Sequence, residues 1–162
     1  MFKKILFSIF FWLISLTWNS ILTIIGIIAS LIALALGGTI HRNGCSFIVE
    51  IGENWGGINL GAISLCAQYS IVNDSWFNHT RCHEFGHAIQ GLIFGPFQIF
   101  IVAIPSAIRY WYQRIRTRKG LPNNEYDNIW FEYTASKWGT KYINWLENQN
   151  YVYNYVISKS KQ

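Results

Sequence analysis

The sequence predicts a mostly helical α+β domain that follows an N-terminal membrane-associated segment. Three observations support this fold class. No charged residue occurs between positions 5 and 37. Two segments with β-type composition flank the turn-forming residues 53–57, and two later segments have apolar residues at helical spacing. We therefore expect residues 1–38 to form a membrane anchor and residues 39–162 to form one domain.

The apolar N-terminal segment is longer than a simple membrane span requires. The chain is 51% hydrophobic and 13% charged, against about 25% charged residues in a typical soluble domain. A spanning helix needs roughly 20 residues, whereas residues 5–36 are mostly apolar and polar types interrupt them at 17–20. Three readings remain: an interfacial helix over 5–16 before a span over 21–36, one long tilted span, or a tight helical hairpin. A cleaved signal peptide is disfavoured, because its apolar region usually has roughly 7–15 residues.

The central and C-terminal segments provide the elements of the domain. Residues 45–51 and 58–66 have strand composition, and the turn between them predicts a small antiparallel hairpin. A helix is expected over 75–93, because Gly-Pro follows it and stops it. Residues 97–108 are expected to form a buried or membrane-surface helix rather than a second crossing. Apolar spacing over 126–146 predicts a last helix.

The charge pattern favours a membrane surface over nucleic acid. The net charge is +5, and basic residues concentrate at Lys3, Lys4 and positions 109–119, where aromatic residues alternate with them. This arrangement suits membrane lipid with anionic headgroups, and no nucleic-acid-binding motif is present. Lys3 and Lys4 place the N-terminus in the cytoplasm under the positive-inside rule, although the later basic cluster leaves the sidedness open.

The three cysteines do not indicate a disulfide framework. Cys45, Cys66 and Cys82 are few and odd in number. We expect them to be small, partly buried hydrophobic residues.

The sequence His83-Glu84-Phe85-Gly86-His87 predicts a metal site. It has the form H-E-x-x-H, and residues four apart lie on the same face of a helix. His83 and His87 can therefore bind one Zn²⁺. Glu84 points beside the metal, where it can accept a proton from water bound to the ion. The predicted chemistry is zinc-assisted hydrolysis, most often of a peptide bond.

A third metal ligand is expected on the last helix. A catalytic zinc usually has three protein ligands and a water. Glu132 lies in the aromatic-rich segment 130–139, and the small Ala135 three positions later would let two helices approach closely. We assign Glu132 as the third ligand. The rivals are Glu125, Asp127 and Glu147.

Other residues near these motifs receive supporting roles. Ser136 is a candidate to orient a ligand histidine. Tyr126 or Tyr133 is a candidate to stabilise the oxyanion. His79 lies four residues before His83 and is interpreted as a first-turn or surface histidine rather than a ligand. Cys82 points away from the histidine face and is interpreted as structural.

These residues resemble the gluzincin group of zincin metallopeptidases. The resemblance covers residues 83–87 and the segment that begins at Glu132. It implies a zincin-like helical core and a peptide or protein substrate. The second motif of that family commonly reads E-x-x-A-D or E-x-x-S-D, with the aspartate bonded to a ligand histidine. Here Ser136 stands at the last position.

The chain is also similar to small uncharacterised bacterial proteins with an apolar N-terminal segment and an H-E-x-x-H helix. The shared positions include Gln90, the Gly-Pro at 95–96, the Pro-Ser at 105–106 and the Gly-Gly-Ile-x-Leu-Gly strand at 56–61. This resemblance implies a singly anchored protein of a bacterial plasma (inner) membrane. It implies no particular substrate.

Two other functions remain to be compared with the zinc peptidase. An intramembrane site-two-type protease also places H-E-x-x-H beside apolar segments, but its third ligand comes from an Asp-Gly motif, which this chain lacks. A non-catalytic zinc-binding membrane protein would need a fourth protein ligand, from Cys82 or His79. The sequence does not indicate an oligomeric state.

Overall fold

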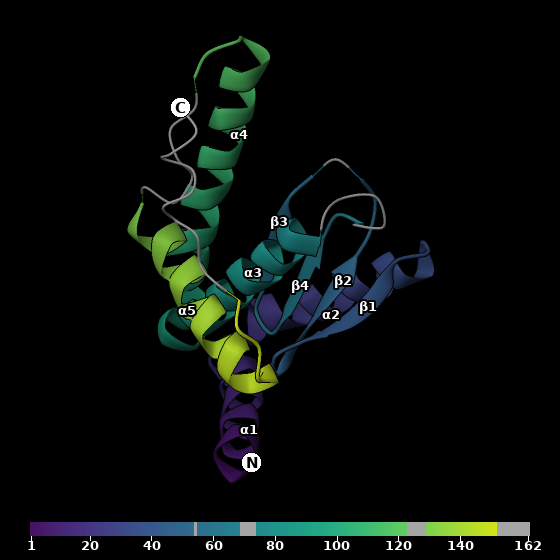
Figure 1. Cartoon of the computed structure of the whole chain (residues 1–162), viewed down its shortest axis with the longest axis vertical. Coiled ribbons are helices and arrows are strands. Elements are labelled where there is room, and N and C mark those ends of the chain that lie inside the picture. The colour runs from purple at the N-terminus through teal and green to yellow at the C-terminus, as the bar shows by residue number, and fades with distance from the viewer. Residues whose placement is uncertain (54, 69–73, 123–128, 152–162) are drawn as a thin grey trace.

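A computed structural model of the chain describes residues 1–53, 55–68, 74–122 and 129–151. These residues form a mostly helical α+β fold with five α-helices and a four-stranded mixed sheet (Figure 1), which confirms the predicted class. The helices are α1 (Phe2–Thr17), α2 (Ser20–Ala35), α3 (Asp74–Phe94), α4 (Ile104–Arg118) and α5 (Trp130–Glu147). A short 3₁₀ turn, η1 (Gly95–Phe97), and a π-helical segment, η2 (Ile99–Ala103), join α3 to α4.

The sheet differs from the single hairpin that the sequence predicts. Its strands are β1 (Thr39–Asn43), β2 (Ser46–Glu50), β3 (Gly57–Leu60) and β4 (Ile63–Cys66), in the order β1-β2-β4-β3. The expected antiparallel pairing of 45–51 with 58–66 is wrong, because residues 58–66 fold back on themselves at Gly61, whose φ is +71°. This turn lets β4 pair parallel with β2 and leaves β3 at the edge.

The N-terminal helices α1 and α2 meet at a sharp bend. The angle between them is 96°, so the reading of one long tilted span is wrong. Among the described residues, no single helix has both the length and the apolar composition for a membrane crossing. Two pairs of consecutive helical segments meet those criteria when the two members of each pair are taken together. They are α1 with α2, and residues 76–97 with residues 99–118, between which the chain bends by 117°.

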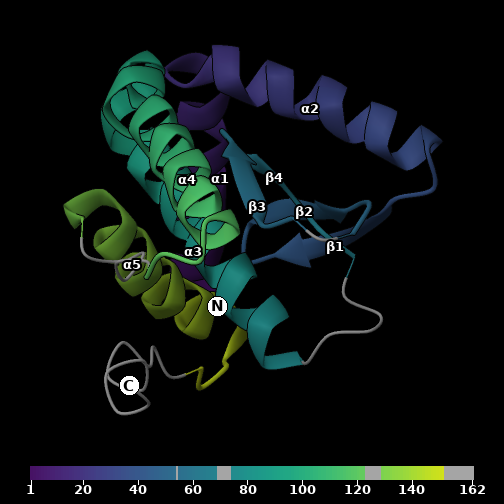
Figure 2. The ribbon, with the colours of Figure 1, turned by 90° about the horizontal axis from the view of Figure 1, so that it is seen from above.

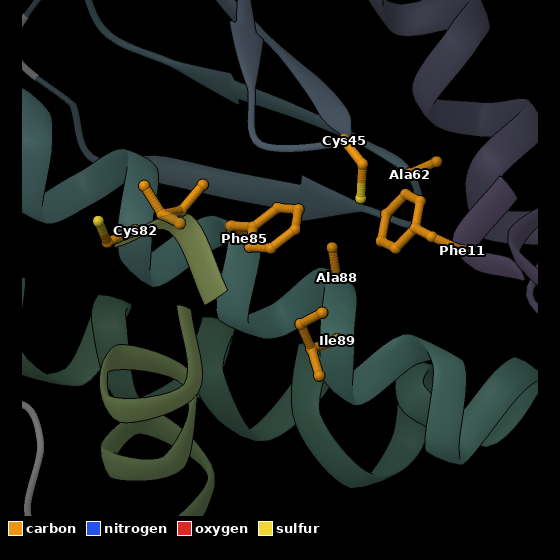
Figure 3. Packing of buried hydrophobic residues seen from close by; sticks show 8 residues of the cluster. Phe11, Cys45, Ala62, Cys82, Phe85, Ala88 and Ile89 are labelled. Atoms are coloured by element: carbon orange, nitrogen blue, oxygen red, sulfur yellow. The ribbon is translucent and has the colours of Figure 1, made fainter. Parts of the chain in front are cut away.

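Both N-terminal helices pack against the rest of the domain. The Phe11 side chain of α1 is fully buried and stacks on Phe85 of α3 at a ring separation of 5.8 Å (Figure 3). Helix α2 contacts the sheet through a second cluster that includes Ala33, Val49 and Leu65. The sheet thus lies between α2 and α3 (Figure 2).

The cysteines are buried and free, as predicted. Burial raises the pKa of the Cys45 thiol to about 12 and that of Cys82 to about 11. Cys45 and Cys82 belong to the same apolar cluster as Phe11 and Phe85. They therefore act as small hydrophobic side chains in the core.

Helices α3 and α5 touch through their backbones. A Cβ atom at Gly86 would overlap the carbonyl of Ala135, and one at Gly139 would overlap the carbonyl of Cys82. Ala135 is fully buried at this crossing, in agreement with the close approach that the sequence predicts. The predicted helix over 126–146 begins later, at Trp130, and residues 123–128 lie outside the described part of the chain.

We predict that Gly139→Ala destabilises the protein, although Gly→Ala inside a helix normally stabilises by about 1 kcal/mol. The added methyl group meets backbone atoms that cannot rotate away, and such overpacking costs about 1–3 kcal/mol. Thermal unfolding followed by circular dichroism measures the change. Gly56→Ala is the control, because a Cβ there has no atom within 4 Å; equal melting temperatures for both variants would contradict the close crossing.

Candidate metal centre

The histidine motif lies on α3. His83 and His87 are four residues apart, and their rings meet edge to face with centroids 4.7 Å apart. The α-helix ends at Phe94, where Gly95 takes a positive φ of +52°. The predicted helix over 75–93 and its Gly-Pro stop are thus confirmed within the described residues.

Helix α5 brings Glu132 to the two histidines. His83 Nε2 lies 3.1 Å from His87 Nε2, and Glu132 Oε2 lies 3.0 Å from the first and 3.4 Å from the second. All three residues are buried. His83, His87 and Glu132 therefore form a compact group that can hold a metal ion.

Gln90 fixes the orientation of the His87 ring. Its amide nitrogen donates to the Phe131 carbonyl at 2.7 Å and to the Thr134 hydroxyl at 2.8 Å. Its Oε1 atom is thus left to face His87 Nδ1, at 2.8 Å. Because an amide oxygen only accepts, Nδ1 carries the proton, and in the neutral ring the lone pair of Nε2 would be available to a metal ion.

Ser136 has the corresponding position beside His83. Its hydroxyl oxygen lies 2.8 Å from His83 Nδ1, and the residue is buried. This is the contact that the sequence predicts for Ser136. A hydroxyl that accepts from Nδ1 leaves His83 Nε2 as a lone-pair donor for a metal.

The Glu132 carboxylate needs a positive partner. The side chain is fully buried, its Oε2 atom lies 3.0 Å from His83 Nε2 and 3.4 Å from His87 Nε2, and its Oε1 atom has no hydrogen-bond partner among the described residues. Burial raises the pKa of this carboxyl, but the adjacent His83 and His87 outweigh that effect and hold the pKa well below its usual range. The carboxylate is therefore charged, and a cation between the three ligand atoms would compensate it.

Glu84 lies beside this group on the same helix. Its carboxylate contacts the backbone of β3, where a Cβ at Gly57 would lie 2.5 Å from Oε1. Burial raises the pKa of Glu84; His83 and His87 act in the opposite direction, and Glu132 adds to the increase. A raised pKa suits a carboxylate that accepts and returns protons.

A cleft of about 390 Å³ gives access to the site. His83, Glu84 and His87 line it, and the edge strand β3 lines one side through Gly57, Ile58 and Asn59. Residues of η2 and α4 line the opposite side, among them Val102, Ala107, Tyr110 and Arg114. The two histidines and Glu84 thus share an opening large enough for a small ligand or part of a chain.

The other sequence-derived candidates lie elsewhere or outside the described residues. His79 is exposed, with its ring 6.2 Å from that of His83. Glu147 pairs with Arg81 at 2.5 Å and accepts from the Gly44 amide. Tyr133 is not among the residues that line the cleft. Glu125, Tyr126 and Asp127 lie outside the described residues.

Sequence reasoning missed three contributors to the site. The role of Gln90 was detectable in principle, because it follows His87 by three residues, which is one helical turn. Gln98 donates to the His87 carbonyl at 2.7 Å and accepts from Asn19 at 3.1 Å. Arg114 enters the cleft from α4. The last two depend on the fold, and no local pattern marks them.

We predict that Ser136→Ala weakens zinc binding by about 10- to 100-fold, the range typical of residues that orient metal ligands. The ring of His83 loses the hydroxyl that faces Nδ1. Competition with a chelating dye measures the affinity, and the melting temperature reports the fold. Lys137→Ala is the matched control on the exposed face of α5; equal zinc affinity in the two variants would exclude this role for Ser136.

Comparisons with protein-family models, curated proteins and solved structures find no match for this chain.

Proposed function

We propose that this protein is a membrane-anchored, zinc-dependent hydrolase, most specifically a metallopeptidase of gluzincin type. The observation that carries the proposal is the buried group of His83, His87 and Glu132, whose two histidines line an open cleft. Glu84 lies in the same cleft beside the two histidines. This combination supports a site that both holds an ion and handles a proton.

The distances between the ligand atoms support zinc. Zinc bonds of about 2.0–2.1 Å in tetrahedral geometry place neighbouring ligand atoms about 3.3 Å apart. The three separations in the site are 3.1, 3.0 and 3.4 Å. Two imidazoles and a carboxylate are also a ligand set of catalytic zinc sites.

The residues around the site support a hydrolytic role. Zinc held by such ligands activates water and polarises a carbonyl group. Glu84 is assigned as the general base, which accepts a proton from the attacking water and returns it to the leaving amine. Gln90 and Ser136 keep the two imidazole rings in the orientation that the ligands require.

The edge strand β3 supports a peptide as the substrate. It pairs with β4 on one side and lies at the end of the sheet. Gly57, Ile58 and Asn59 also line the cleft. An extended peptide can add to such an edge through main-chain hydrogen bonds, which would place its carbonyl groups along the site.

The surface of the N-terminal helices supports the membrane location. Many large apolar side chains are exposed on α1, α2 and the segment from η1 to α4. Lys3 and Lys4 precede this surface, and basic and aromatic residues alternate on α4. The proposed partner of this surface is membrane lipid.

The alternative functions have weaker support. A structural zinc site needs a fourth protein ligand, and the metal-binding group found among the described residues contains neither Cys82 nor His79. A site-two-type protease takes its third ligand from an Asp-Gly motif, whereas here the nearby carboxylate belongs to Glu132 on α5. We therefore favour the gluzincin-type peptidase.

We predict that Glu84→Gln keeps bound zinc but lowers peptidase activity by about 10²- to 10⁴-fold, because the amide cannot accept the proton. Metal analysis of the purified protein and cleavage of a mixed peptide library measure the two properties. Glu53→Gln, at an exposed position, is the control. Zinc in both proteins with no cleavage by the wild type would favour the non-catalytic binding protein.

We predict that Glu132→Ala lowers zinc affinity by at least about 100-fold while the fold remains, since one of three ligands is lost. Zinc titration measures the affinity, and circular dichroism reports the helix content. Glu53→Ala should bind zinc like the wild type. Unchanged affinity in Glu132→Ala would place the third ligand elsewhere.

A further inference from the structure

The side of the cleft opposite β3 carries a permanent positive charge. Most residues on that side are apolar, such as Val102, Ala103 and Ala107, but Arg114 of α4 also lines the cleft. An arginine stays protonated at every physiological pH. The described lining therefore combines an apolar surface with one fixed cation, in addition to the titratable groups near the metal site.

Neighbouring aromatic residues hold the Arg114 guanidinium in place. Its Nη1 atom donates to the Tyr110 hydroxyl at 3.0 Å. Its Cζ atom lies 5.8 Å from the centre of the Trp111 ring. Both aromatic residues also line the cleft. The side chain is thus positioned before a ligand arrives, which lowers the entropic cost of binding.

No carboxylate neutralises this cation within the described part of the chain. The ion pairs found there involve His41, Arg81, His83 and His87 as the basic partners. Among the residues that the structure describes, the guanidinium makes one hydrogen bond to a protein oxygen, that of the Tyr110 hydroxyl. A planar guanidinium with remaining N–H donors is well suited to a carboxylate.

We propose that Arg114 makes the cleft selective for peptides that carry a carboxylate within a mostly apolar segment. The apolar side chains would contact Val102, Ala107 and the Trp111 ring, and the carboxylate would pair with the guanidinium. Tyr110 is then a positioning residue, because it acts on the ligand through Arg114. The choice of a peptide rests on the function proposed above, but the charge selectivity is testable without turnover.

The test uses full-length protein in neutral detergent micelles with the Glu84→Gln substitution, so that bound peptide is not cleaved. The probes are blocked octapeptides of alanine and leucine with one glutamate at each position in turn, and the same series with glutamine. Calorimetry gives the affinity of each pair, with zinc present and after its removal by a chelator. Arg118→Gln is the matched control, because Arg118 is exposed one turn further along α4.

We expect the glutamate peptide to bind about ten-fold more tightly than its glutamine partner at one or more positions, as for a hydrogen bond to a charged group. Arg114→Gln should remove this preference, Tyr110→Phe should reduce it, and Arg118→Gln should retain it. Added salt should weaken the preference.

Three results would overturn the proposal. The glutamate and glutamine peptides could bind equally at every position, the glutamate preference could survive in Arg114→Gln, or Arg118→Gln could lose as much of the preference as Arg114→Gln. The last result would indicate a general attraction to the basic helix, such as one for anionic lipid. Failure of the proposed zinc site gives a different pattern. The wild type would then neither bind zinc nor cleave peptides, but the preference for glutamate peptides would persist after treatment with the chelator.

Discussion

The site depends on the backbone contact between α3 and α5. Gly86 and Gly139 leave no side chain between the two helices, and the small Ala135 lies in the same crossing. The short separation lets Glu132, one turn before Ala135, extend its carboxylate between two imidazoles on the other helix. A larger residue at either glycine would move this carboxylate away from the histidines.

The close contact between α3 and α5 has an electrostatic cost that a metal ion would remove. It brings two imidazole nitrogens and a carboxylate oxygen together in a buried space. Gln90 directs the lone pair of His87 toward this space, while its amide nitrogen bonds to α5. The same residue therefore orients a ligand and joins the two helices. Gln98 extends the network from His87 to Asn19, so the bend between α1 and α2 connects to the metal site.

Much of the site was predictable from local sequence, whereas the sheet was not. H-E-x-x-H spacing fixes the geometry of His83 and His87 as soon as a helix forms. Glu132 was predictable because it lies in a helical segment in which the small Ala135, three positions later, allows another helix to approach closely. The pairing of β2 with β4 depends on the turn at Gly61 and on α2, which packs against it through Thr23. Arg114 reaches the cleft because the chain bends by 117° between η1 and η2. Such long-range contacts leave no periodic pattern in the sequence.

X-ray absorption at the zinc edge of metal-loaded protein measures which atoms coordinate the ion in this site. We expect one zinc ion per chain with a shell of nitrogen and oxygen ligands at about 2.0–2.1 Å, two of them imidazoles, and no sulfur. Loss of one oxygen ligand in Glu132→Ala would agree with this coordination. A sulfur ligand at about 2.3 Å, a third imidazole, or a protein that takes up no zinc would contradict it.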